Sequence, residues 1–345
     1  MDSDISESVI GFDALYESMA KCRSGVIWKD SVARYCLHGI EETLKLERQL
    51  KDGTYKAARP VAFKIMHPKE RDIVSIVFRD RVYQRSHNDN VLYPVMVKSF
   101  IRDNCACQKG KGTDDARARF KMHLQKQYRR SGMDFYILQC DIKGYYPNMR
   151  HDVVLDMFRK KLDPWSYEAC EAVLTEQYGG ETGYNPGSQM VQIAGISVLD
   201  PLDHFIKERL RIKHYLRYMD DFILMHESAE YLEYCRGQIV LKLAEIGFDL
   251  HEKKTRIYPA AEGVKLLGFN FRISPTGKVT MLIIPKNVKV ERKKLRRLVA
   301  LARSGKITKA KADECYSGWR NHASKGDSEM LLRRMDRYYK DLWKE

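Results

Sequence analysis

Residues 214–225, HYLRYMDDFILM, place two adjacent carboxylates between two apolar runs. Apolar runs of this length indicate short buried strands, so Asp220 and Asp221 are predicted to lie at the tip of a strand pair. Two like charges held side by side in this way repel each other and lose hydration. Aspartate is common in exposed turns, but a turn between two buried strands has no need of two anions. The segment therefore predicts a hairpin whose tip faces bound cations.

A third aspartate ends a second apolar run. Residues 135–142, FYILQCDI, predict a buried strand that ends at Asp141, and a Gly-Tyr-Tyr-Pro break precedes a helix from about residue 150. Asp141 and Asp220 would converge if the strands lie side by side in an antiparallel sheet. Mg²⁺ prefers carboxylate oxygens, and two such ions roughly 3.5–4 Å apart can clamp the attacking and leaving oxygens of a phosphoryl transfer. The sequence thus predicts a site for two Mg²⁺ ions, with Mn²⁺ as a substitute.

Helical and extended patterns alternate along the rest of the chain. We predict a helix at residues 31–51, a hairpin followed by a helix within residues 61–84, and a helix at residues 228–246. Residues 286–306 carry nine lysines and arginines against a single acid, Glu291, and predict a strongly basic helix. Strands and helices in this order indicate an α+β fold.

The composition narrows the class of partner. Lysine and arginine outnumber aspartate and glutamate by 61 to 46, a formal charge of +15 that favours polyanions, although many basic proteins are merely soluble. The N-terminus has no signal-peptide pattern and no apolar run approaches about 18 residues, so we expect no membrane partner. The eight cysteines are scattered, with only Cys105 and Cys107 close together, and predict reduced thiols in a cytoplasmic protein.

Two of these motifs resemble those of one enzyme family. Residues 218–221, YMDD, match the signature of reverse transcriptases, and DIKGYYPNM from Asp141 resembles the family's first catalytic motif, an aspartate followed five residues later by an aromatic. The resemblance covers about residues 60–275 and is greatest to bacterial enzymes of diversity-generating retroelements, defence systems and group II introns. It implies a right-hand polymerase fold, with N-terminal helices and fingers at 1–140, a palm at 141–275 with a fingers insertion at about 150–182, and a helical thumb at 276–345.

The resemblance assigns roles to the catalytic motifs by position. It implies that Asp141 and Asp220 are the principal metal ligands, that Asp221 is a supporting catalytic carboxylate, and that Ile142 adds its backbone carbonyl to the metal shell. Tyr146 falls at the steric-gate position, where an aromatic ring under the incoming sugar collides with a 2′-hydroxyl. The resemblance therefore implies deoxynucleotide substrates.

Other segments resemble the parts of the family that bind the nucleotide. HPKERDIV is similar to the PKxR segment of the fingers, which implies that Lys69 and Arg71 grip the triphosphate. A lysine near the triphosphate corresponds to Lys254 or its neighbour Lys253, with a solvated turn as the alternative. Residues 183–195, GYNPGSQMVQIAG, resemble the second motif, a glycine turn entering a helix beneath the nascent base pair.

Within that second motif, Gly187 matches the turn glycine and Gln192 the glutamine of the family's Ser-Gln pair. Two positions depart from the pattern, because Val191 stands where that pair has serine and Pro186 precedes the glycine. These departures leave template handling and fidelity open.

Template and primer contacts are also implied by the resemblance. Lys111 lies in a KGKGT stretch, which does not satisfy the phosphate-loop pattern GxxxxGK[ST]. The stretch resembles a basic loop of the family that holds a template phosphate and precedes a helix capped by Thr113. A charged helix start is the alternative. KLLGFNF resembles the hairpin that grips the primer, and the basic helix resembles a thumb that follows the duplex. The residues implied in these contacts besides Lys111 are Tyr218, Met219, Leu267, Gly268, Lys293 and Arg297.

The leading interpretation is an RNA-directed DNA polymerase that adds dNTPs to a primer. We expect as partners a template RNA, in particular a structured non-coding RNA of a retroelement or antiviral defence system, the cDNA product, dNTPs, and an accessory protein or a second copy of the chain. An RNA-dependent RNA polymerase is the first alternative, disfavoured by Tyr146 and the YMDD form. A catalytically inactive RNA-binding palm is the second, disfavoured by the three retained aspartates.

Overall fold

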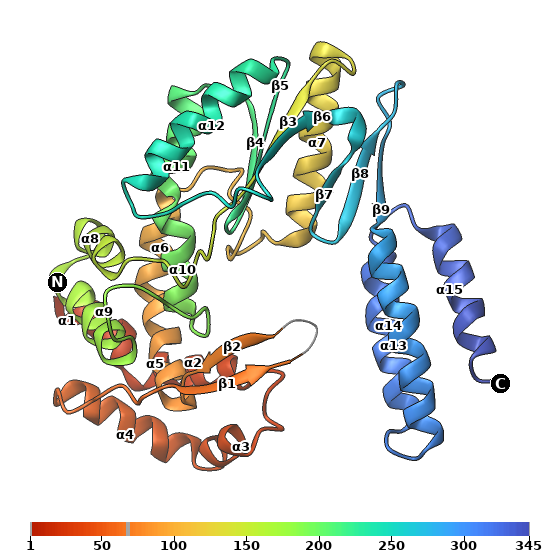
Figure 1. The fold of residues 1–345 in the computed structure, drawn as a ribbon. Coiled ribbons are helices and arrows are strands. Elements are labelled where there is room, and N and C mark those ends of the chain that lie inside the picture. The colour runs from red at the N-terminus through yellow and green to blue at the C-terminus, as the bar shows by residue number, and fades with distance from the viewer. Residues whose placement is uncertain (1, 67–69, 345) are drawn as a thin grey trace.

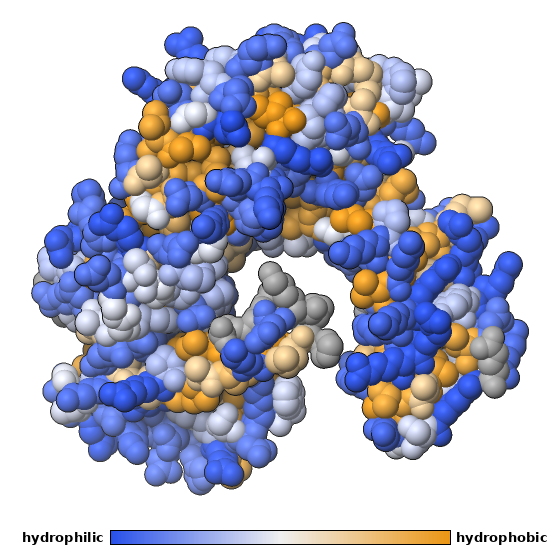
Figure 2. Space-filling view, viewed as in Figure 1, coloured by the Kyte–Doolittle hydropathy of each residue, from blue (hydrophilic) through white to orange (hydrophobic). Residues whose placement is uncertain are grey.

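A computed structural model describes residues 2–66 and 70–344. Figure 1 shows an N-terminal helical lobe that carries a β-hairpin, a central sheet with helices on both faces, and a C-terminal helical arm. Figure 2 shows a hollow between these three parts. The N-terminal lobe comprises α1 (Asp2–Ile10), α2 (Phe12–Arg23), α3 (Asp30–Leu37), α4 (Gly39–Lys51), β1 (Val61–Ile65), β2 (Arg71–Ser75), α5 (Phe78–His87), the π-helix η1 (Asn88–Leu92), α6 (Tyr93–Met96) and the 3₁₀-helix η2 (Val97–Ser99).

The central sheet is antiparallel with the strand order β4-β5-β3-β6. Its register places Asp141, the last residue of β3, directly opposite Asp221, the first residue of β5. The predicted antiparallel pairing of these two strands is therefore confirmed. From α7 onward the elements are α7 (Thr113–Ser131), β3 (Tyr136–Asp141), α8 (His151–Lys161), α9 (Pro164–Gln177), α10 (Gln189–Val198), α11 (Asp200–His204), the π-helix η3 (Phe205–Arg209), β4 (His214–Tyr218), β5 (Asp221–His226), α12 (Ala229–Ala244), β6 (Arg256–Pro259) and the 3₁₀-helix η4 (Ala260–Glu262). Of these, α8 and α9 lie beside α1 in the N-terminal lobe (Figure 1).

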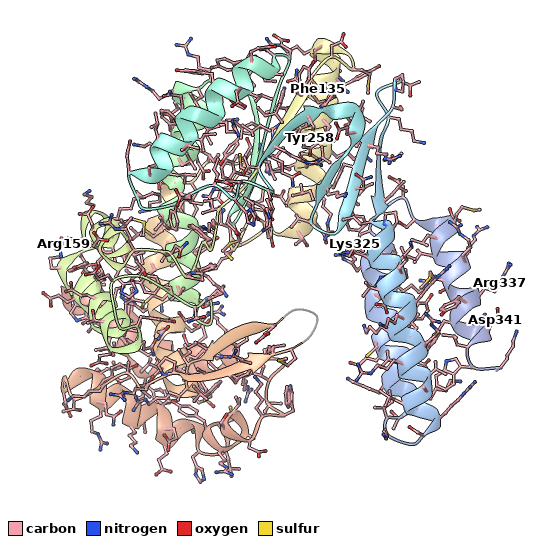
Figure 3. The ribbon with its side chains drawn as sticks, viewed as in Figure 1. Phe135, Arg159, Tyr258, Lys325, Arg337 and Asp341 are labelled. Carbon is pink, nitrogen blue, oxygen red and sulfur yellow. The ribbon has the colours of Figure 1, made fainter. Side chains whose placement is uncertain are left out.

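Both faces of the central sheet are covered, which explains why its strands read as continuous apolar runs. Alternate residues of β5 point to opposite faces. Phe222 and Leu224 join the cluster that α12 covers, whereas Ile223 and Met225 join a cluster with α7. Phe135 and Tyr258, labelled in Figure 3, belong to the α7 side. A strand buried on both sides is a rigid mount for the residues at its ends.

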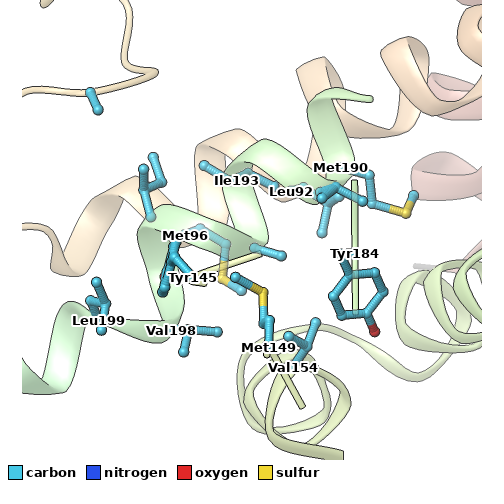
Figure 4. Close-up of a cluster of buried hydrophobic side chains, with 14 of the residues drawn as sticks. Leu92, Met96, Tyr145, Met149, Val154, Tyr184, Met190, Ile193, Val198 and Leu199 are labelled. Carbon is cyan, nitrogen blue, oxygen red and sulfur yellow. The ribbon is translucent and has the colours of Figure 1, made fainter. Parts of the chain in front are cut away.

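The α12 side of the core continues beneath the turn that follows β3. Tyr145 and Met149 from this segment pack with Met190, Ile193 and Val198 of α10 (Figure 4). Tyr145 is 3% exposed, as expected for a packing residue. This packing fixes the segment that follows β3 against α10.

The predicted helix at 31–51 is in fact two helices. The chain bends at His38, with φ −108° and ψ 33°, between α3 and α4. Val32 and Leu46 are buried, but Leu37 and Ile40 are 79% and 60% exposed. Because the bend changes the direction of the chain, the apolar positions do not share one face.

The helical arm is joined to the central sheet by a second, three-stranded antiparallel sheet of order β7-β8-β9. The predicted palm boundary at residue 275 falls between β8 and β9, so this sheet crosses it. The last elements are β7 (Val264–Leu266), β8 (Phe269–Ile273), β9 (Val279–Ile283), α13 (Pro285–Arg303), α14 (Lys309–Ala323) and α15 (Glu329–Asp341). The arm has its own core around Leu295, Tyr316 and Met335. None of the helices in the described residues has the length and apolar character needed to cross a bilayer.

One buried histidine predicts acid sensitivity of this fold. His87 is fully buried beside Cys170, and burial lowers the pKa of its imidazole to about 4. Unfolding exposes the ring, which then binds a proton below a pKa of about 6.5. The free energy of unfolding should therefore fall by up to about 3 kcal/mol as the pH drops from 6.5 to 4. Urea denaturation across this range measures the slope, and His87→Gln should flatten it; an unchanged slope in the variant would contradict the assignment.

Candidate active site

The YMDD segment forms the tight turn between β4 and β5. Tyr218 pairs with Asp221, so Met219 and Asp220 alone make the loop. Met219 has φ +58°, a conformation that two-residue hairpins require but that a side chain other than glycine adopts at a cost of about 1–3 kcal/mol. The strained turn presents Asp220 beside the end of β3, as the hairpin prediction requires.

The three predicted aspartates lie together at this end of the sheet. Burial raises the pKa of the Asp220 carboxyl, and the charge of Asp141 adds to the effect. Burial also raises the pKa of Asp221 well above its usual range, and so do the charges of Asp220 and Asp141. Both shifts come first from burial and then from the neighbouring carboxylates, which disfavour the ionised form.

Lys254 forms an ion pair with one of these carboxylates. Its Nζ lies 2.7 Å from Oδ2 of Asp141. The sequence left the choice between Lys253 and Lys254 open, and this ion pair favours Lys254. A lysine here can neutralise part of the acidic cluster and contact an incoming triphosphate.

The donor chemistry at this site fits Mg²⁺, although the described residues contain no ready group of three His, Cys, Asp or Glu side chains that could hold a metal ion. Three carboxylates supply the hard oxygen donors that Mg²⁺ selects, and burial raises the pKa of two of them, Asp220 and Asp221. The bridge between Ile142 and Leu250 uses the Asp141 carbonyl and the Lys143 N–H. It leaves the Ile142 carbonyl outside the bridge, as the implied metal role needs.

Tyr146 lies between the acidic cluster and α10. A Cβ atom added to Gly195 of α10 would be only 2.8 Å from Oη of Tyr146, so the glycine allows the ring to lie against the helix. The ring also packs edge-on against Tyr145, with centroids 5.4 Å apart. Burial raises the pKa of its phenol, and the nearby charges of Cys107 and Asp220 contribute. The ring is thus held between α10 and Tyr145, and its role as a steric gate stays a prediction.

The second-motif segment lies against the hairpin of the N-terminal lobe. A Cβ at Gly187 would lie 2.7 Å from the carbonyl oxygen of Val74 in β2, so only glycine fits. Gln192 donates from Nε2 to the Pro186 carbonyl at 3.2 Å. Gln192 also lines a polar cavity of about 280 Å³ with Arg85 and Lys109. A polar cavity at this position suits a template strand or base.

Of the two residues predicted to bind the triphosphate in the fingers, only Arg71 lies within the described part of the chain. Lys69 lies outside the described residues. Arg71 begins β2, where its backbone pairs with Ile65 in the β1–β2 hairpin. The predicted hairpin is confirmed, and the triphosphate contact of both residues stays a prediction.

Lys111 is engaged locally. Its Nζ donates to the carbonyls of Asn104 at 2.8 Å and Arg102 at 3.1 Å, and burial lowers its pKa. Thr113 was predicted to cap the following helix, and this is wrong. Gly112 is the N-cap of α7 without a side-chain cap bond, and Thr113 is its first helical residue. The lysine therefore braces its own loop, and its contact with a template phosphate stays a prediction.

The predicted primer-grip residues occupy the turn between β7 and β8. Leu267 and Gly268 have φ +46° and +88°. A Cβ on Gly268 would lie 3.0 Å from Nε2 of His322 in the helical arm. This turn therefore sits where the second sheet meets the arm. Lys293 and Arg297 are exposed on α13, as expected for residues that bind a phosphate backbone.

The sequence did not single out Arg217 or Asp203, although both are fully buried and paired at 2.6 Å behind the YMDD turn. An arginine inside the apolar run YLRYM was the available signal, because a buried arginine requires a charged partner.

An antiparallel sheet with aspartates at adjacent strand ends, facing a hairpin across from a helical arm, defines the right-hand polymerase fold. A family model described as reverse transcriptase (RNA-dependent DNA polymerase) matches residues 68–271, and the chain belongs to this family. The matched residues include β2 and the central sheet, and the assignment of the β1–β2 hairpin, the central sheet and the helical arm to fingers, palm and thumb stays a prediction.

Solved structures with a similar fold include telomerases. Telomerase from Candida albicans, in complex with a TWJ fragment of telomeric RNA, matches with TM-score 0.50 and 12% identity over 83% of this chain and 55% of that chain. Apo telomerase from Candida tropicalis matches with TM-score 0.45 and 14% identity over 71% of this chain and 53% of that chain. The same telomerase truncated from its C-terminal domain matches with TM-score 0.47 and 14% identity over 71% of this chain and 60% of that chain. The chain thus spans little more than half the length of these structures. Comparison with curated proteins gives no match.

The ion pair of Lys254 predicts a role in dNTP binding, and the neighbouring Lys253 provides a control variant. Lys254→Met should raise the KM for dNTP about tenfold, because one charged hydrogen bond near the triphosphate is lost. Lys253 is also exposed, and the ion pair is formed by its neighbour, so Lys253→Met should leave the KM within about twofold. Steady-state primer extension measures both values. Equal effects of the two substitutions would remove the assignment.

Proposed function

We propose that this protein is an RNA-directed DNA polymerase that extends a primer with dNTPs on an RNA template. The observation that carries the proposal is the register of the central sheet, which sets Asp141 opposite Asp221 and beside the Asp220 turn. Membership of the reverse transcriptase family supports it.

In the proposed reaction, the primer 3′-hydroxyl attacks the α-phosphate of the dNTP, and pyrophosphate leaves. Two bound Mg²⁺ ions would supply the Lewis-acid stabilisation of the attacking and leaving oxygens. Asp141, Asp220 and the Ile142 carbonyl would hold them, with Asp221 in support. Catalysis by the chain is then mainly positioning, in which the acidic residues keep their places on two paired strands.

Other groups of the chain fix the substrates. Lys254 donates to the Asp141 carboxylate and would contact the triphosphate. The Tyr146 ring would lie under the sugar. Gln192 and its cavity would contact the template, and the exposed cations of α13 would contact the duplex backbone without reading sequence.

We further propose that the template is a dedicated structured RNA of a bacterial or phage retroelement or antiviral defence system. The support is the resemblance of the KGKGT and GYNPGSQM segments to such enzymes, together with the net charge of +15. A cytoplasmic location and an accessory protein or second copy of the chain belong to the same proposal.

Sequencing the RNA and cDNA that copurify with the protein tests the template proposal. One abundant RNA with matching cDNA is the expected result. A random sample of cellular RNA without cDNA would contradict it. Extension of a defined RNA-templated primer with dNTPs or rNTPs tests the polymerase separately: dNTP use is expected, rNTP preference would indicate an RNA polymerase, and no extension would indicate a binding scaffold.

A further inference from the structure

A buried arginine lies directly behind the catalytic turn. Arg217 of β4 and Asp203 of α11 are each 0% exposed. The guanidinium binds the carboxylate through two bonds, Nε to Oδ1 at 2.7 Å and Nη2 to Oδ2 at 2.6 Å. Tyr215 also donates to Oδ1 of Asp203 at 2.6 Å. These charge-assisted hydrogen bonds keep the arginine side chain in one orientation.

The remaining donors of this guanidinium reach two parts of the active site. Nη1 donates to the Met219 carbonyl at 3.1 Å, and this carbonyl belongs to the peptide that joins Met219 to Asp220. Nη2 donates to the Ile196 carbonyl of α10 at 2.9 Å. Ile196 follows Gly195, against which the Tyr146 ring lies. One side chain thus connects the strained turn to the helix beneath the sugar position.

The backbone around Arg217 is held as firmly. Its N–H donates to the Asp103 carbonyl and its carbonyl accepts from the Cys105 N–H, both at 3.0 Å. These two bonds and the pairing of β4 with β5 hold the strand in register from both sides. A replacement at Arg217 should change the orientation of the turn rather than the register of β4.

We propose that the Arg217–Asp203 pair is a positioning device that sets the Met219–Asp220 peptide, and through it the Asp220 carboxylate, relative to α10. The pair touches no substrate and acts through Asp220. The proposal rests on the polymerase function proposed above.

The decisive variant removes both charges. A buried ion pair can be replaced by apolar residues of similar volume without loss of stability, whereas removal of one partner leaves an unpaired buried charge. Arg217→Met should therefore unfold at lower temperature. The Arg217→Met/Asp203→Leu double variant should recover part of the wild-type Tm, because only the hydroxyl of Tyr215 then loses its charged partner. The double variant still lacks the donor to Met219. We expect its kcat to stay at least about tenfold low, with Kd for primer–template within about twofold of wild type.

One further measurement and two further variants distinguish a positioning role from a role in stabilising the fold. The Mg²⁺ concentration at half-maximal rate should rise in the double variant, because a displaced Asp220 holds the ion less well. Arg217→Lys, which keeps one charge but not the forked geometry, should fold and show the same loss of kcat. Arg130→Met, in the exposed Arg130–Glu227 pair, should match wild type in every measurement.

The outcomes are distinct. A folded double variant or a folded Arg217→Lys with wild-type kcat and Mg²⁺ dependence would overturn the positioning role. An inactive wild-type protein would overturn the polymerase function instead.

Discussion

Asp220→Asn should reduce dNTP incorporation at least about 1,000-fold while the protein still folds and binds RNA. Asparagine keeps the shape of the turn but removes the negative charge that would hold a cation between the strand ends. Because burial raises the pKa of Asp220, the ionised carboxylate opposes folding at neutral pH. The metal-free variant should therefore have a Tm at pH 7.5 no lower than that of wild type.

Primer extension, thermal unfolding and RNA binding on the same preparations test this expectation. Asp341→Asn is the matched control, since Asp341 lies on α15 in the helical arm (Figure 3) and contacts Lys344. The control should retain wild-type extension. Incorporation by Asp220→Asn within tenfold of wild type would refute the metal assignment, and loss of RNA binding would show that the charge supports the fold or the RNA site.

The sequence predicted the elements that depend on local patterns. The runs FYILQCD and DFILMH are apolar on every residue that the sheet buries, and they became β3 and β5. The 228–246 helix was equally clear, because Leu232, Cys235, Ile239 and Leu243 repeat at helical spacing and are all buried. Local spacing also placed the three aspartates at strand ends, from which an antiparallel sheet brings them together.

Features that depend on how one element packs or pairs with another were not predictable in this way. Lys111 reads as a free cation, and only the fold shows that backbone carbonyls surround its ammonium group. The partner of Arg217 is 14 residues away on another element, and no spacing rule connects them. The palm boundary predicted at residue 275 falls in the short turn that joins β8 to β9, and only their pairing shows that both strands belong to one sheet.

Tyr146→Ala should lower the preference for dNTPs over rNTPs about 100-fold. The ring is backed by Gly195 on one side and by Tyr145 on the other, so it cannot retreat when a 2′-hydroxyl approaches. Alanine removes this obstacle and leaves space for the hydroxyl. Competition between matched dNTP and rNTP in single-nucleotide extension measures the ratio of the two kcat/KM values.

Tyr146→Phe separates the ring from its hydroxyl group. Within the described residues, Oη of Tyr146 is buried and has no hydrogen-bond partner. Its removal should therefore leave sugar selectivity within about twofold of wild type, and Tm should not fall, because no hydrogen bond is lost. If Tyr146→Phe lost selectivity as Tyr146→Ala does, discrimination would depend on the hydroxyl group and not on the bulk of the ring. If Tyr146→Ala kept wild-type selectivity, another residue would have to exclude ribonucleotides.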